Sequence, residues 1–214
     1  MMLRLVPAIA ALALAGCASL PAVSARDGEA ATDAAVAADR AFAERAAREG
    51  QWTAFRATAT TDAVMFLPEP VEVSRFLAGR ANPPASVRWW PTEAYASCDG
   101  RTVATRGGAD WPGGQHSHYL TWWGQQPDGA WRWSMDTGAT VATAPAAGRR
   151  LTRRVASCAN RSAMPSPFAN DQRHGASADG TLRWALEGDG PAARVLVRMW
   201  DGSALQLIAD VPVA

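Results

Sequence analysis

Three residues on two neighbouring predicted strands have side chains suited to moving a proton. His118 and Tyr119 lie on one of these strands, and Asp136 lies on the next. A carboxylate or an imidazole can act as a general acid or base, and a tyrosine hydroxyl can stabilise negative charge that develops on a substrate oxygen. These are the groups that an isomerase or a dehydratase without a cofactor would need. Their use together depends on which of them share a face of the sheet.

Alternation along the strands separates these candidates into two sets, because successive side chains of a strand point to opposite faces. On the first strand one face carries His116, His118, Leu120 and Trp122, and the other carries Ser117, Tyr119, Thr121 and Trp123. On the next strand Trp131, Trp133 and Met135 are expected to oppose Arg132, Ser134 and Asp136. The sequence leaves open which face lines a pocket. Asp136 as a surface acid and Tyr119 as a core aromatic residue therefore stay as alternatives to catalytic roles.

The histidines do not predict a metal site. His116 and His118 are two residues apart, a spacing that puts both imidazoles on one strand face, where they could hold zinc. Catalytic zinc needs a third protein ligand, and the third histidine, His174, lies in a separate loop-like segment. The chain also has no fingerprint of a phosphate loop, a dinucleotide site or a serine nucleophile. We therefore expect neither a metal nor a cofactor.

Tryptophan is the most unusual part of the composition, with 10 in 214 residues. The pairs Trp89-Trp90 and Trp122-Trp123 place indoles on both faces of adjacent strands. One face can line a ligand pocket, for which the candidate contacts are Trp89, Tyr95, Trp122 and Trp133. The other face must be covered, since large exposed apolar patches are rare on monomers. The cover is either the C-terminal strands with Trp184 and Trp200, which we favour, or the second subunit of a homodimer.

Charge and composition exclude two classes of protein. The chain has 21 basic residues, all of them arginine, against 20 acidic ones, for a net charge of +1. A nucleic-acid binder needs a basic footprint, so we expect no nucleic-acid partner. With 48% hydrophobic residues the chain is too apolar to be disordered. The arginine-rich run at 149–154 could contact lipid phosphates or cell-wall polymers, or it could be a solvated linker.

The pattern of the chain indicates helices first and strands afterwards. A helix capped by Thr32 is expected to end at Gly50, followed by a second one at 51–58, a strand at 62–67 and a short helix at 71–79. Four strands then follow, at 87–98, 101–106, 116–126 and 130–137, with a glycine-rich loop at 107–114. Asp-Gly turns join the first pair and the last pair of these strands. This order indicates an α+β fold, in which the strands form an antiparallel meander.

The C-terminal third has a separate β pattern. Residues 139–180 are expected to be a linker and loop region, and residues 181–214 a small antiparallel β extension. An isolated three-stranded piece of about 30 residues buries too little surface to be stable by itself in water. We therefore expect the extension to pack on the main domain at 32–138.

The N-terminus resembles that of a bacterial lipoprotein. A single basic residue, Arg4, precedes an apolar run at 5–14 that is too short to span a bilayer. The residues Leu14-Ala15-Gly16-Cys17 are similar to a lipobox. The resemblance implies a signal peptide at 1–16, lipidation of Cys17 and a tether at 17–31. With Ala18 after the cysteine, it implies the periplasm-facing inner leaflet of the outer membrane. The alternative is an ordinary signal peptide with an incidental cysteine.

This export route bears on the two remaining cysteines. With Cys17 lipidated, Cys98 and Cys158 form an even pair in an oxidising compartment. We expect them to form a disulfide that ties the C-terminal part to the main domain, with two unpaired buried thiols as the alternative.

Residues 37–138 resemble the NTF2-like superfamily, in particular its SnoaL-like and DUF4440-type members. The resemblance rests on Ala38-Asp39-Arg40-Ala41-Phe42, on Asp62-Ala63-Val64-Met65-Phe66, and above all on Asp128-Gly129-Ala130-Trp131 after the tryptophan-rich strand. It implies a cone of curved antiparallel sheet wrapped around N-terminal helices, with a pocket at the wide end. Residues 140–214 lie outside it.

Three functions remain open for such a domain, because this fold supports many chemistries and some members without any. The first is a membrane-anchored periplasmic protein that binds a small apolar ligand without catalysis. The second is a cofactor-free isomerase or dehydratase of the SnoaL or ketosteroid-isomerase type, acting through Asp136, His118 or Tyr119. The first helix has no tyrosine, so the oxyanion donor of ketosteroid isomerases is missing from its usual place. The third is an interaction module that docks a partner on a tryptophan-rich sheet face.

Overall fold

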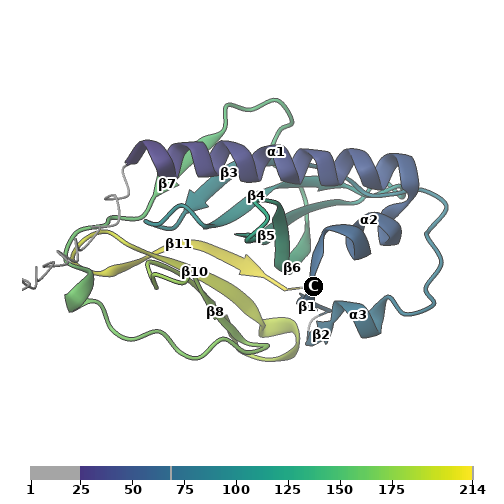
Figure 1. Cartoon of the computed structure of the whole chain (residues 1–214). Coiled ribbons are helices and arrows are strands. Elements are labelled where there is room, and N and C mark those ends of the chain that lie inside the picture. The colour runs from purple at the N-terminus through teal and green to yellow at the C-terminus, as the bar shows by residue number, and fades with distance from the viewer. Residues whose placement is uncertain (1–24, 68, 214) are drawn as a thin grey trace, which may run out of the picture.

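A computed structural model describes residues 25–67 and 69–213 of the chain. Figure 1 shows a long helix, α1, running along one side of a large sheet, with a smaller sheet on the opposite side. The large sheet is therefore the middle of three layers.

Two consecutive helices open the described chain, α1 (Ala25–Glu49) and α2 (Gln51–Thr58). Gly50 separates them with a positive φ of 98°, a conformation that glycine adopts without strain. The second helix was predicted correctly, but the start of the first was not. Thr32 is not a cap: it lies inside α1, and its hydroxyl donates to the carbonyl of Glu29 at 2.7 Å. The alanine-rich segment predicted to be a tether favours helix and extends α1 toward the N-terminus.

The large sheet has seven strands in the order β2-β1-β6-β5-β4-β3-β7. Its strands are β1 (Ala59–Phe66), β2 (Pro70–Glu72), β3 (Arg88–Ala96), β4 (Thr102–Asp110), β5 (His116–Gln125), β6 (Trp131–Val141) and β7 (Thr152–Val155). The central strands β3 to β6 form the predicted antiparallel meander. Two pairs are parallel, β1 with β6 and β3 with β7, so the edges of the sheet depart from the purely antiparallel arrangement that was expected.

Several predicted loops contribute to the sheets. The glycine-rich loop expected at 107–114 is partly strand, since β4 continues to Asp110. Gly107 fits there because a β-carbon would collide with the backbone of Trp90 on the neighbouring strand. The region predicted as linker at 139–180 contains the end of β6, all of β7, a 3-10 turn (Arg161–Ala163) and β8. The short helix expected at 71–79 is divided into β2 and α3 (Val73–Phe76).

The smaller sheet has four antiparallel strands in the order β11-β10-β9-β8. They are β8 (His174–Ala176), β9 (Leu182–Glu187), β10 (Arg194–Trp200) and β11 (Leu205–Pro212), with a 3-10 turn (Gly190–Ala192) between β9 and β10. The predicted C-terminal strands are thus confirmed, and β8 adds a fourth.

The smaller sheet covers the outer face of the large one, as predicted. Leu120 and Trp122 of β5 belong to the same buried cluster as Trp184 of β9 and Val197 of β10. A second cluster lies on the inner face, where the large sheet packs against the helices. Both faces of the tryptophan-rich sheet are therefore buried within one chain.

The predicted disulfide between Cys98 and Cys158 is confirmed, with the two Cα atoms 5.2 Å apart. Backbone contacts next to it also join the two sheets: the amide of Cys98 donates to the hydroxyl of Thr181 at 2.9 Å, and the amide of Ser157 donates to the carbonyl of Trp200 at 2.9 Å. The C-terminal part is consequently fixed to the main domain both covalently and by hydrogen bonds. The arrangement as a whole is the expected α+β fold, a curved sheet with N-terminal helices and a small antiparallel sheet.

Candidate functional site

A cavity of about 310 Å³ lies between the inner face of the large sheet and the helices. Its lining comes from the helices α1, α2 and α3, from β1 and β3, and from one end of the central strands β4, β5 and β6. The volume is at the lower end of the range of about 300–1,000 Å³ typical of small-molecule sites. Most of the lining is apolar or aromatic, and it includes Phe42, Trp52, Phe55, Phe76, Val87, Trp89 and Trp111.

An aromatic cluster holds the helices at a fixed distance from the sheet. Phe42 of α1 has its ring centroid 4.8 Å from that of Phe55 on α2 and 4.7 Å from that of Trp89 on β3, both edge to face. Trp133 of β6 packs against Phe55 at 5.5 Å. Such pairs stabilise beyond their buried area, so the cluster forms a rigid wall.

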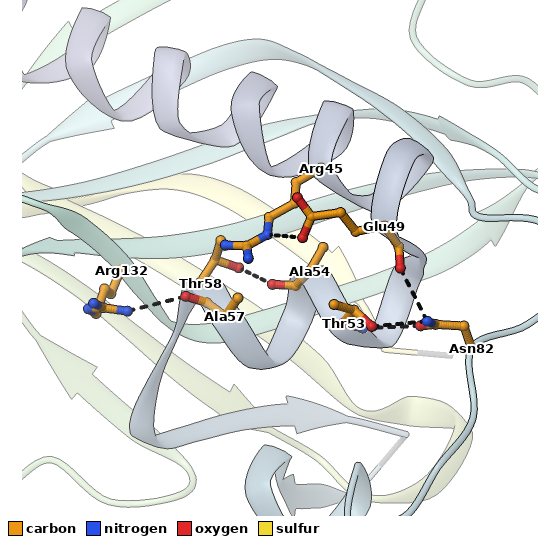
Figure 2. Close-up of polar contacts among 8 residues, drawn as sticks. All are labelled: Arg45, Glu49, Thr53, Ala54, Ala57, Thr58, Asn82 and Arg132. Carbon is orange, nitrogen blue, oxygen red and sulfur yellow. Dashed lines mark hydrogen bonds and ion pairs between the residues drawn. The ribbon is translucent and has the colours of Figure 1, made fainter.

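Polar contacts at both ends keep α2 in place (Figure 2). At its start, the side-chain amide of Asn82 donates to the carbonyl of Glu49 at 3.3 Å and to the hydroxyl of Thr53 at 2.9 Å. At its end, the Arg132 guanidinium donates to the carbonyl of Ala57 at 3.2 Å. These contacts position the cavity-lining side chains of α2.

A bulge in β6 decides which residues face the cavity. Trp122 pairs with Met135, yet the next residue of β5, Trp123, pairs with Trp133, so Ser134 is an extra residue in β6. A bulge of this kind shifts the alternation by one position. Trp133 and Asp136 therefore both belong to the inner face, whereas strict alternation predicted them on opposite faces.

Asp136 is the acid of this cavity. The hydroxyl of Thr121, opposite it on β5, donates to its Oδ1 at 2.6 Å. Burial away from solvent raises the pKa of Asp136 from 3.8 to about 7; the hydrogen bond from Thr121 opposes this shift, and the nearby carboxyl of Asp39 adds to it. The alternative of an exposed strand-end acid is therefore wrong for Asp136.

Asp39, a residue that sequence reasoning missed as a site residue, lies beside the cavity on α1. Its side chain is fully buried and accepts two hydrogen bonds of 2.8 Å, from the indole of Trp89 and from the hydroxyl of Tyr119. Burial raises its pKa, against the effect of hydrogen bonds from Thr105, Tyr119 and Trp89. A signal was present in the sequence: Ala35, Asp39, Phe42 and Ala46 follow one helical stripe, and a carboxyl on that apolar stripe must be buried.

Tyr119 lines the same cavity as Asp136, but its hydroxyl proton is already engaged by Asp39. Burial and the neighbouring Asp39 carboxyl raise its pKa well above 10.0. Tyr119 is thus held as a neutral donor to Asp39 and has no second proton to give to a ligand oxygen.

His118 borders the cavity, but alternation along β5 places its side chain on the outer face with Leu120 and Trp122. There it interacts with the backbone of Pro212, near Arg106 and Arg194, and its pKa is lowered by burial and by these charges. Its Nε2 has no hydrogen-bond partner. The structure therefore brings together two of the three catalytic candidates and separates the third.

The four residues predicted to contact a ligand are also divided between the inner and the outer face of the large sheet. Trp89 lines the cavity, and Trp133 is buried next to it among the inner-face residues. Tyr95 and Trp122 are not cavity residues: both belong to the core between the two sheets. They were misplaced because the sequence could not show which face of each strand is the concave one.

The described part of the chain contains no group of three or more histidine, cysteine or acidic residues able to hold a metal ion. His116 instead contacts Asp110 at 2.8 Å, and His174 contacts Asp171 at 3.1 Å.

The comparisons with known proteins add little. No family model matches the chain, and no curated protein matches it in sequence. Among solved structures it is similar to a proposed aromatic ring hydroxylase of Novosphingobium aromaticivorans, with 16% identity, a TM-score of 0.37, and coverage of 56% of this chain and 92% of that one. A likeness at this level does not bear on function.

Cys17, the predicted lipidation site, and the predicted signal peptide lie outside the described residues. Within residues 25–67 and 69–213, no helix is both long enough and apolar enough to cross a membrane.

Proposed function

We propose that this protein binds a small, largely apolar molecule in the cavity between the helices and the inner face of the large sheet. The observation that carries the proposal is the composition of the cavity, about 310 Å³ of space lined by aromatic and aliphatic side chains. Asp136 is the one carboxyl in its lining among the described residues, and it would fix the orientation of the ligand. A mostly apolar pocket with few polar groups is the usual form of a small-molecule site.

Binding without catalysis is favoured over a reaction by the state of the possible donors. The proton of Tyr119 goes to Asp39, the hydroxyl of Thr121 goes to Asp136, and the imidazole of His118 lies on the other face. A cofactor-free isomerase needs donors directed at a developing oxyanion. Tyr119, Thr121 and His118 therefore supply no such free pair of donors beside Asp136.

A second candidate, proton transfer by Asp136, is favoured by one observation. The pKa of about 7 lies where a carboxyl can both give and take a proton at neutral pH. An isomerase or dehydratase reaction would then depend on Asp136 alone, with the substrate supplying its own activated position. We do not propose a docking module, because the smaller sheet covers the outer tryptophan-rich face.

A variant whose side chain fills the cavity tests the proposed binding. Ala109 of β4 lines the cavity, so Ala109→Phe would place a ring inside it. We expect this variant to bind the neutral probe 2-naphthalenemethanol at least tenfold more weakly in calorimetric titration. Ala37→Phe, at an exposed position of α1, is the matched control and keeps its affinity. Equal affinity of all three proteins, or no binding by the unaltered protein, contradicts the proposal.

We also propose that lipidated Cys17 anchors the protein to the outer membrane, facing the periplasm. The lipobox-like residues 14–17 support this, and the disulfide agrees with an oxidising compartment. Cys17→Ala should move the protein from the membrane fraction to the soluble fraction of the cell envelope. Continued membrane retention of this variant would refute lipidation.

A further inference from the structure

The charge of the cavity excludes one class of ligand. Its described lining contains the carboxyl of Asp136 and no arginine, and the chain contains no lysine. A negatively charged group taken into this space would lose its water without gaining a cationic partner, and it would share the space with the carboxyl of Asp136, which is costly in an apolar environment. The ligand is therefore neutral or positively charged.

One oxygen of Asp136 is available to such a ligand. Its Oδ1 accepts the hydroxyl of Thr121, and its Oδ2 has no partner among the described residues. The side chain is partly accessible and lines the cavity. Oδ2 is thus a free acceptor at the wall of an apolar space.

A second carboxyl, that of Asp39, lies near Asp136 but outside the cavity lining. Asp39 is held by Tyr119, and Asp136 is held by Thr121, two residues further along β5. Side chains two positions apart on a strand share a face and lie about 6.8 Å from each other. Arg40, which acts on Asp39 and Tyr119, is exposed on α1 and does not line the cavity. The carboxyl of Asp136 therefore has no arginine in the described cavity lining to compete with a cationic ligand.

The aromatic side chains of the cavity complement positive charge in a second way. Cations are attracted to the faces of tryptophan, tyrosine and phenylalanine rings, and more strongly where water is excluded. The indoles of Trp52 on α2, Trp89 on β3 and Trp111 in the loop after β4 line the cavity. An ammonium group at Asp136 would share the cavity with these indoles, while the remainder of the ligand fills the apolar space.

We propose that the cavity takes a cationic ligand, a small amine with an aromatic or aliphatic body of one or two rings, whose ammonium group donates to Oδ2 of Asp136. This inference depends on the small-molecule binding proposed above and names its ligand class.

Three naphthalene probes of similar shape test it: 2-naphthylmethylamine, 2-naphthalenemethanol and 2-naphthoate, titrated into the purified protein at pH 8. We expect the amine to bind at least tenfold more tightly than the alcohol and the naphthoate to bind most weakly. Asp136→Asn should reduce the amine to the affinity of the alcohol. Asp62→Asn, which removes an exposed carboxyl outside this cavity, should leave the tenfold preference unchanged.

The outcomes separate the two proposals. If the alcohol binds as tightly as the amine, or if Asp136→Asn keeps the preference for the amine, the cationic ligand is wrong while the cavity remains a binding site. If none of the three probes binds, both proposals fail. Repeating the titration at pH 5.5 gives an independent check, because protonation of Asp136 should remove most of the advantage of the amine.

Discussion

Replacing Asp136 with asparagine should stabilise the folded protein above neutral pH. The folded state holds the proton of Asp136 up to a pKa of about 7, whereas the ordinary value is 3.8. Below pH 3.8 the carboxyl is protonated in both the folded and the unfolded chain, so it does not lower the free energy of unfolding. Between the two values the unfolded chain releases the proton first, so the free energy of unfolding falls as pH rises. Above pH 7 the carboxyl is ionised in both the folded and the unfolded chain, so this group lowers the free energy of unfolding no further.

The size of this effect follows from the shift of about 3.2 pKa units (7 − 3.8). At 1.36 kcal/mol per unit, the unaltered protein loses about 4 kcal/mol of stability through this one group. Asparagine does not titrate and can still accept the hydroxyl of Thr121. The difference in unfolding free energy between Asp136→Asn and the unaltered protein should therefore grow by about 1.4 kcal/mol per pH unit from pH 4 to pH 7 and then become constant.

Urea unfolding of both proteins at half-unit pH intervals measures this difference directly. Thr121→Val provides a control in which the pH-dependent change in stability relative to the unaltered protein has the opposite sign. It removes the hydrogen bond that lowers the pKa of Asp136, so the free energy of unfolding should continue to fall up to a higher pH than in the unaltered protein. A difference between Asp136→Asn and the unaltered protein that stays constant with pH would refute the burial of this carboxyl as described.

Two further predictions concern the attachment of the smaller sheet. Reducing the disulfide between Cys98 and Cys158, which are 60 residues apart, should lower the free energy of unfolding by about 4 kcal/mol in the chain-entropy model. Urea unfolding with and without reductant measures this, and an unchanged midpoint would contradict it. Gly175→Ala should cost about 1–3 kcal/mol, because its β-carbon would collide with the indole of Trp184, whereas Gly113→Ala has nothing within 4 Å and should be neutral. Equal thermal midpoints of these two variants would refute the close packing of β8 on Trp184.

The order of the elements could be predicted from the sequence, because local signals specify it. The Asp-Gly turns between β3 and β4 and between β5 and β6 set the meander, and the change from helical to alternating patterns set the fold class. The predicted bounds of an element were less accurate where the sequence contains only a weak signal for its start or end. Thr32 has the chemistry of a helix cap, but alanine-rich residues before it extend α1 to Ala25.

The site was harder to predict, because a single extra residue changes it. Period-two alternation put Asp136 on the face opposite Trp133, and the bulge at Ser134 puts them on the same face. Nothing in the local sequence marks this bulge, since Ser134 is neither a glycine nor part of a turn. The pairing of β6 with β5 on one side and β1 on the other determines it, and that pairing is a property of the folded sheet.

Adjacent residues of β5 contribute to two different regions, the core between the two sheets and the wall of the cavity. Leu120 and Trp122 point outward and are fully enclosed by the smaller sheet, so the burial of this face does not depend on the helices. Tyr119 and Thr121 point inward and donate to two carboxyls, that of Asp39 beside the cavity and that of Asp136 in its lining. A domain that packs its outer face with a covalently attached second sheet can leave the inner face incompletely filled. The C-terminal sheet therefore stabilises the outer face of the large sheet independently of how completely the cavity on the inner face is filled.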